Sequence, residues 1–195
     1  MSFKSPKISI ALFVCSLIAF VACKNVDPNV HVVTIANEYS LEIPNHLVET
    51  NELNQDASLQ YKDTSGDYEE YVIVINEPKD DFIKNFAEDS VFGPLYDKNA
   101  SAAKNYCTVE MAVIKDKAKL AAPPHIQTTK IDGLDAEMAD FVGQPNNLED
   151  NIYYKVAFIE GKKNLYMVMA WTMAETKDKY NAEMEKMLNS FKLVQ

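Results

Sequence analysis

Two adjacent segments of alternating side chains, residues 152–160 and 164–172, constrain the fold more than any other part of this sequence. Each is typical of a β-strand, because successive side chains of a strand point to opposite faces, and Gly161-Lys162-Lys163 between them is typical of a hairpin turn. Both faces are largely apolar: Ile152, Tyr154, Val156, Phe158, Leu165, Met167, Met169 and Trp171 share one, and Tyr153, Lys155, Ala157, Ile159, Tyr166, Val168 and Ala170 share the other. We therefore expect this hairpin in the middle of a sheet that is covered on both sides, with Phe158 and Trp171 buried.

Three further pairs of alternating segments predict three more hairpins. They are residues 30–35 with 39–43, 57–62 with 68–76, and 125–131 with 134–142. The last pair flanks Asp132-Gly133, which suits a type I′ turn because glycine accepts a positive φ without strain. An antiparallel sheet built of hairpins follows from these patterns.

Three segments with helical spacing supply the cover that this sheet needs. The first begins at Pro78, which suits a first helical position, and ends before Gly93-Pro94. The second spans about residues 98–119 and the third about residues 175–190, each with an apolar stripe. The fold class predicted is α+β: an α/β/α sandwich with a central antiparallel sheet flanked by helices on both faces.

The first 23 residues indicate where the protein is located. Lys4 and Lys7 precede an apolar run of about 15 residues, short of the roughly 20 that a spanning helix needs, and the run ends in Ala22-Cys23. We expect a lipoprotein signal peptide at residues 1–22, a short tether with a lipidated Cys23 at residues 23–29, and a single domain at residues 30–195. An ordinary cleaved signal and an uncleaved anchor are the alternatives.

The charge of the mature chain excludes several classes of partner. Of 19 basic residues, two lie in the signal segment, which leaves 17 against 29 acidic residues and a formal charge of −12. Every basic residue is Lys, so no guanidinium is available for bidentate recognition of phosphate or guanine. We expect no nucleic-acid partner, and we expect the membrane to be reached through the lipid anchor rather than through headgroup charge.

The residues that usually carry chemistry form no recognisable motif. His31, His46 and His125 are far apart and predict local or solvent-facing roles, and Cys107 lies on an apolar helical stripe, where a thiol behaves as a small hydrophobe. The acidic segment 63–70 lacks the ligand spacing of an EF-hand and favours a solvated turn. We therefore predict no catalytic residue, no metal ligand and no cofactor.

The order of several short motifs resembles the PsbP-like family, including the DcrB-like bacterial lipoproteins. The resemblance covers roughly residues 31–195 and is carried by the segments 39–44 (YSLEIP), 131–136 (IDGLDA), Tyr153-Tyr154 and 189–192 (NSFK). It implies an α/β/α sandwich around an antiparallel sheet. It also implies a non-catalytic accessory role, such as an extrinsic subunit, an envelope lipoprotein or a chaperone for hydrophobic segments.

The function predicted is that of a non-catalytic accessory protein, lipid-anchored in the bacterial envelope and facing the periplasm. We expect it to bind or stabilise another envelope or membrane protein, and a hydrophobic segment of that protein is one candidate for the bound part. The candidate partner-binding residues are on two loops: Tyr96 on one, and Asn146, Asn147, Glu149 and Asp150 on the other. Two alternatives stay open, a small-molecule or ion-binding module with a pocket between sheet and helix, and an unrecognised hydrolase. The aromatic and methionine side chains of residues 153–173 suit either a core or a groove for an apolar peptide.

Substitution of Cys23 tests the predicted anchor. Cys23→Ser should abolish lipidation and either block signal processing or leave the chain without acyl groups, because the thiol is the site of acylation. Mass spectrometry of the purified product measures this directly. An unmodified mature N-terminus in the wild-type protein would refute the lipoprotein assignment.

Overall fold

The computed structural model describes residues 27–35, 37–65 and 70–194. The signal segment, Cys23, most of the tether and part of the predicted turn at residues 63–70 lie outside this range. Among the described helices, none combines the length and the hydropathy that crossing a membrane requires.

The larger of two sheets has eight antiparallel strands. Its strand order is β3 (Leu47–Glu49), β4 (Ala57–Asp63), β5 (Tyr71–Pro78), β10 (Asn164–Met173), β9 (Ile152–Glu160), β8 (Leu134–Pro145) and β6 (Ala118–Leu120), with β7 (His125–Ile131) also paired to β8. The predicted central hairpin is β9–β10, which has strands on both sides. Register pairs Met167 with Phe158 and Trp171 with Tyr154, so the two predicted faces are the observed ones.

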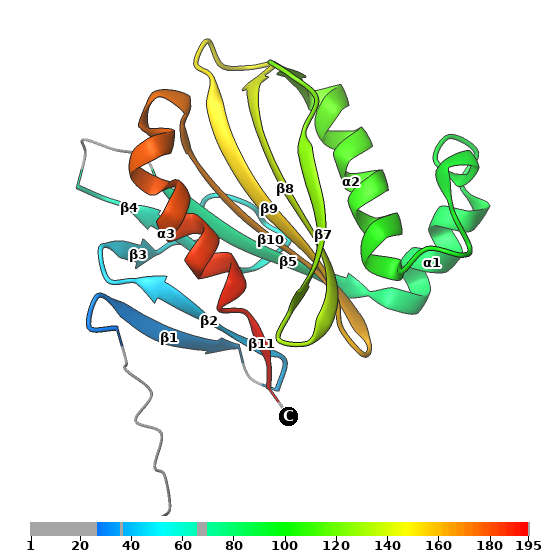
Figure 1. The fold of residues 1–195 in the computed structure, drawn as a ribbon, viewed down its shortest axis with the longest axis horizontal. Coiled ribbons are helices and arrows are strands. Elements are labelled where there is room, and N and C mark those ends of the chain that lie inside the picture. Colours follow the sequence, from blue (N-terminus) through cyan, green and yellow to red (C-terminus); the bar gives the residue numbers. More distant parts are fainter. Residues whose placement is uncertain (1–26, 36, 66–69, 195) are drawn as a thin grey trace, which may run out of the picture.

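Helices cover both faces of this sheet. On one face, α1 (Lys79–Glu88) and α2 (Ala102–Lys117) enclose a core that contains Phe158, Val156 and Leu165. On the other face, α3 (Lys177–Asn189) and a three-stranded sheet, β1 (Val30–Ile35), β2 (Tyr39–Pro44) and β11 (Lys192–Leu193), enclose a second core. Figure 1 shows α3 on one side of β8, β9 and β10 and α2 on the other. The predicted α/β/α sandwich is confirmed.

The turn between β7 and β8 has the backbone that was predicted for it. Asp132 has φ 52° and Gly133 has φ 78°, two consecutive positive values that define the type I′ geometry. Lys130 and Asp135 form an ion pair across this hairpin.

The helices are shorter than the segments that their sequence patterns predict. Pro78 ends β5, and α1 begins at Lys79. The predicted second helix loses residues at both ends: Ser101 caps α2 by accepting a hydrogen bond from the Lys104 amide, and residues 118–120 pair with β8 as β6. The last helix begins after a short 3₁₀ turn, Ala174–Thr176.

Trp171 is not buried as its alternation predicted. Phe158 on the same face is fully buried, whereas Trp171 stays partly exposed and stacks on Tyr71, with ring centroids 5.1 Å apart. The alternation identified the face correctly, but it carries no information on how far along each strand the helices extend.

Alanine substitutions of Phe158 and Trp171 should lower the free energy of unfolding by different amounts. Phe158→Ala should lower the free energy of unfolding by about 3 to 5 kcal/mol, because it leaves a cavity in a closed core. Trp171→Ala should cost only about 1 to 2 kcal/mol, because water already reaches part of the ring. Denaturant unfolding measures both, and equal losses would show that the end of the sheet is closed in solution.

Candidate functional site

A row of aromatic side chains crosses the eight-stranded sheet near one end of its strands. Tyr71, Trp171, Tyr154 and Phe141 come from β5, β10, β9 and β8, and the register places each opposite the next. Tyr71 stacks on Trp171, Tyr154 tilts against Trp171 at 6.5 Å, and Phe141 stacks on Tyr154 at 5.0 Å. Cross-strand aromatic pairs of this kind stabilise a sheet and present flat apolar area.

Part of this row forms the floor of an open groove, which we call the aromatic groove. It is a hollow of about 250 Å³, and its lining residues are Leu53, Tyr71, Leu148, Ile152, Tyr154, Trp171, Thr172 and Met173. Tyr71, Tyr154 and Trp171 are partly exposed, and Leu148 is 49% exposed at the rim. The apolar face that α1 and α2 bury elsewhere is therefore open to solvent at this end.

Two connections form the rim of the groove and carry its charge. Residues 50–56 contribute Leu53, and residues 146–151 contribute Leu148. These connections hold four acidic residues, Glu52, Asp56, Glu149 and Asp150, and no basic residue. Among the described residues, Glu52 is the one of these four that forms an ion pair, with Lys62 of β4 at 2.7 Å, so the rim is acidic.

The 146–151 connection is held at both ends. The Gln144 side-chain amide donates a hydrogen bond to the Glu149 carbonyl at 2.7 Å, and the Asn146 side chain donates one to the Asp116 carbonyl of α2. The Ala174 amide donates to the Asn151 carbonyl at 2.9 Å. These hydrogen bonds fix both ends of the connection, and Leu148, Glu149 and Asp150 lie between them.

The structure brings together four of the five candidate partner-binding residues. Asn146, Asn147, Glu149 and Asp150 are exposed on the rim of the aromatic groove. Tyr96 is at the other end of α2, where its ring packs on Phe86 at 5.4 Å and its loop is bonded to Asn105. Because the 16 residues of α2 span about 24 Å, Tyr96 does not belong to the same surface.

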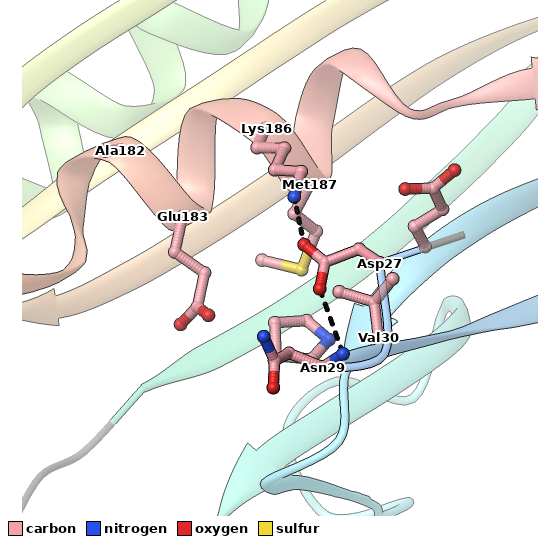
Figure 2. Close-up of a pocket in the computed structure, with 9 residues that line it drawn as sticks. Asp27, Asn29, Val30, Ala182, Glu183, Lys186 and Met187 are labelled. Atoms are coloured by element: carbon pink, nitrogen blue, oxygen red, sulfur yellow. Dashed lines mark hydrogen bonds and ion pairs between the residues drawn. The ribbon is translucent and has the colours of Figure 1, made fainter. Parts of the chain in front are cut away.

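A second hollow lies between α3 and the β1–β2 hairpin. Its volume is about 250 Å³, and Figure 2 shows the ion pair between Asp27 and Lys186 that crosses it. Asp27 also accepts a hydrogen bond from the Asn29 amide at 2.9 Å, and the Lys186 hydrogen bond holds the pKa of Asp27 below its usual value. This is the pocket between sheet and helix that the small-ligand alternative requires, but the Asp27–Lys186 ion pair already spans it.

A third hollow, between α1, α2 and β5, is lined by three carboxyl groups, those of Glu77, Asp89 and Glu110. Burial raises the pKa of Glu77 and of Glu110 above the usual value. None of its described lining residues is a histidine, cysteine or serine. Nearby Cys107 faces the core, so the prediction that it is buried is confirmed, and burial raises the pKa of its thiol to about 12, which disfavours the reactive thiolate.

The structure also brings together three ionisable side chains that sequence spacing did not connect. His46 Nε2 lies 2.9 Å from Glu70 Oε2 and 3.7 Å from Glu183 Oε1. Glu70 is fully buried, which corrects the expectation that segment 63–70 is solvated throughout. His31 and His125 make simpler contacts, with Asn45 and Asp140.

Burial governs the chemistry of Glu70. It raises the pKa of this carboxyl to about 7, with the neighbouring Glu183 acting in the same direction and His46 opposing both. No local motif reveals this cluster, because His46, Glu70 and Glu183 come from the β2–β3 turn, the start of β5 and α3. Only the tertiary fold joins them.

Comparison with known proteins identifies the fold. The family model described as PsbP matches residues 31–193, whereas a search of curated proteins gives no match. The solution structure of cyanobacterial PsbP (CyanoP) from Synechocystis sp. PCC 6803 is similar with a TM-score of 0.52 and 13% identity, over 90% of this chain and 99% of that one. LpqN of Mycobacterium tuberculosis, described as involved in cell envelope biogenesis, is similar with a TM-score of 0.49 and 7% identity, over 85% and 91% of the two chains.

The family match covers the described fold from β1 to β11, and it agrees with the resemblance carried by the short sequence motifs. The CyanoP structure has the same architecture, and at 13% sequence identity this similarity shows the fold alone. The chain belongs to the PsbP family.

Proposed function

We propose that this protein is a lipid-anchored accessory protein of the bacterial envelope, which binds a segment of another envelope protein in the aromatic groove and catalyses no reaction. The observation that carries the proposal is the partly exposed row of Tyr71, Trp171 and Tyr154, open to solvent at the end of a sheet face that α1 and α2 bury elsewhere. Tyrosine and tryptophan are the side chains that most often dominate the energy of protein interfaces.

The shape of the groove favours a protein segment over a small molecule. Sites for small ligands enclose most of the ligand surface, whereas protein interfaces combine an apolar centre with a polar rim. The groove has an aromatic floor, Leu53 and Leu148 at its sides and an acidic rim. The α3 hollow, which would serve the small-ligand alternative, is already crossed by the Asp27–Lys186 pair.

The charge of the rim defines the partner further. Glu149, Asp150, Glu52 and Asp56 lie on the two connections that border the floor, without a basic residue among them. An apolar segment flanked by Lys or Arg complements this surface, because opposite charges at a rim speed encounter and disfavour acidic competitors. The occupant we propose is such a segment.

The predicted anchor increases the opportunity for this contact. Asp27–Asn29 are bonded to the domain, with Asn45 donating from its backbone amide to the Asn29 carbonyl and from its side chain to the Pro28 carbonyl. Residues 24–26 then remain between the proposed lipidated Cys23 and the bonded chain, about 10 Å when extended. A tether this short keeps the local concentration of the domain high near membrane partners.

A photo-reactive amino acid at position 148 tests the groove in cells. Leu148 is 49% exposed inside the rim, and Ile126 on β7 is a matched control, 44% exposed on a different edge of the sheet. We expect a discrete adduct with an envelope protein from position 148 and none from position 126. Equal adduct yields at positions 148 and 126 would show that the adducts arise from random collision and not from binding at the groove.

Charge reversal at the rim should weaken that adduct. Glu149→Lys with Asp150→Lys should lower its yield several-fold and leave the melting temperature unchanged, because both side chains are exposed. The paired control is Asp80→Lys with Asp81→Lys, adjacent exposed acidic positions at the start of α1, at the opposite end of β5 from Tyr71. Unchanged capture by the Glu149/Asp150 variant would discard the site, and turnover abolished by one carboxylate or histidine substitution would discard the non-catalytic function.

A further inference from the structure

Three side chains from three separate elements converge beside α3. His46 is on the turn between β2 and β3, Glu70 directly precedes β5, and Glu183 is on α3. His46 Nε2 lies 2.9 Å from Glu70 Oε2 and 3.7 Å from Glu183 Oε1, and one ligand atom from each residue lies within 4.8 Å of the others. We refer to them as the His46 cluster.

The His46 cluster is electrostatically incomplete. Glu70 is fully buried, and its Oε1 is a buried polar atom without a hydrogen-bond partner. A buried carboxylate oxygen that lacks a partner is costly, and such atoms are rare in native structures.

A simple histidine–carboxylate ion pair does not account for this arrangement. The same imidazole nitrogen, His46 Nε2, faces both carboxylates, and it donates at most one proton. A protonated imidazole would bring one positive charge to two negative ones and still leave Glu70 Oε1 unbonded. A divalent cation would match both charges and would accept oxygen lone pairs as ligands.

We propose that His46, Glu70 and Glu183 form a binding site for a divalent cation of the Zn²⁺ class. One imidazole nitrogen and two carboxylates are zinc ligands, and three protein ligands leave the fourth tetrahedral position for water or another donor. Zinc–ligand bonds of about 2.0 to 2.2 Å place ligand atoms roughly 3.3 to 3.6 Å apart, which the observed 2.9 and 3.7 Å bracket. Calcium takes six to eight oxygen ligands and suits this donor set poorly.

The fourth position is reachable from solvent. An open hollow of about 390 Å³ adjoins the cluster, lined by His46, Glu183, Asp63, Ser65, Lys179 and Tyr180. The side chains of His46 and Glu183 are 41% and 37% exposed, so both can turn toward an ion that enters from this hollow. Lys179 at the mouth is bonded to the Tyr180 hydroxyl at 2.8 Å.

A cation at this position would join three parts of the fold. It would link α3 to the β2–β3 turn and to the start of β5, which otherwise meet through packing and through the contacts of His46 with Glu70 and Glu183. Figure 2 shows that the neighbouring Lys186–Asp27 pair does not include Glu183, so Glu183 can ligate without breaking that pair. The site is separate from the aromatic groove, and its test does not depend on the proposed function.

Metal titration of the full-length protein tests the site. The protein is stripped with a chelator, and Zn²⁺ alone is then added while the melting temperature is followed; Co²⁺ is used in parallel for its ligand-field absorption. We expect saturation at one ion per chain and a higher melting temperature, because a ligand that binds only the folded state stabilises it. Binding without saturation, or the same stabilisation by Mg²⁺ or Ca²⁺, would overturn the assignment.

Variants then locate the ion. His46→Asn and Glu183→Gln should each weaken Zn²⁺ binding by at least about tenfold, the loss typical of even an outer-shell partner, and should stay folded because both side chains are partly exposed. Glu70→Gln should do the same if it folds. The matched control is His125→Asn, which removes another exposed histidine paired with a carboxylate, Asp140. Unchanged affinity in the His46 and Glu183 variants, or an equal loss in the control, would overturn the proposal.

Discussion

The apolar character of both faces of the β9–β10 hairpin is the constraint on which the rest of the structure depends. Phe158 and Leu165 on one face and Ile159 and Val168 on the other are fully buried. A strand pair of this kind is unstable unless both faces are covered, so the chain supplies α1 and α2 on one side, and α3 with the β1–β2–β11 sheet on the other. The neighbouring strands protect its edges, and the proposed partner-binding groove lies where this cover ends.

The incomplete cover leaves one end of this sheet face open to solvent, and this is where we propose that recognition occurs. Helices α1 and α2 close the face over Phe158, but Trp171 further along the same face is partly exposed. Trp171, which would lie in the core if the helices reached this end of the strand, therefore forms part of the groove floor. Cross-strand stacking on Tyr71 restrains its ring.

Much of the fold could be predicted from the sequence because periodicity reports local structure directly. The central hairpin, the Asp132-Gly133 turn and the three helices follow from spacing and turn chemistry. The short strands β3, β6 and β11 could not be predicted, because two or three residues carry no period and pair only through tertiary contact. Trp171 was placed on the right face but at the wrong depth, and the His46 cluster joins residues that no spacing rule connects. Of the candidate partner-binding residues, those of the 146–151 connection follow from its polar sequence and lie together on the groove rim. Tyr96 lies at the other end of α2, a separation that no local pattern reports.

The contacts of residues 27–29 have a mechanical consequence. Any tension applied through the N-terminus reaches the solvent-exposed Asp27–Lys186 pair and the Asn29–Asn45 bond first, and then the β1–β2 ladder. These strands belong to the small sheet, whereas the groove is built on the larger one, whose strands begin at Leu47. Tension on the N-terminus would therefore separate β1 from β2 in the small sheet before it distorted the strands that carry Tyr71, Tyr154 and Trp171.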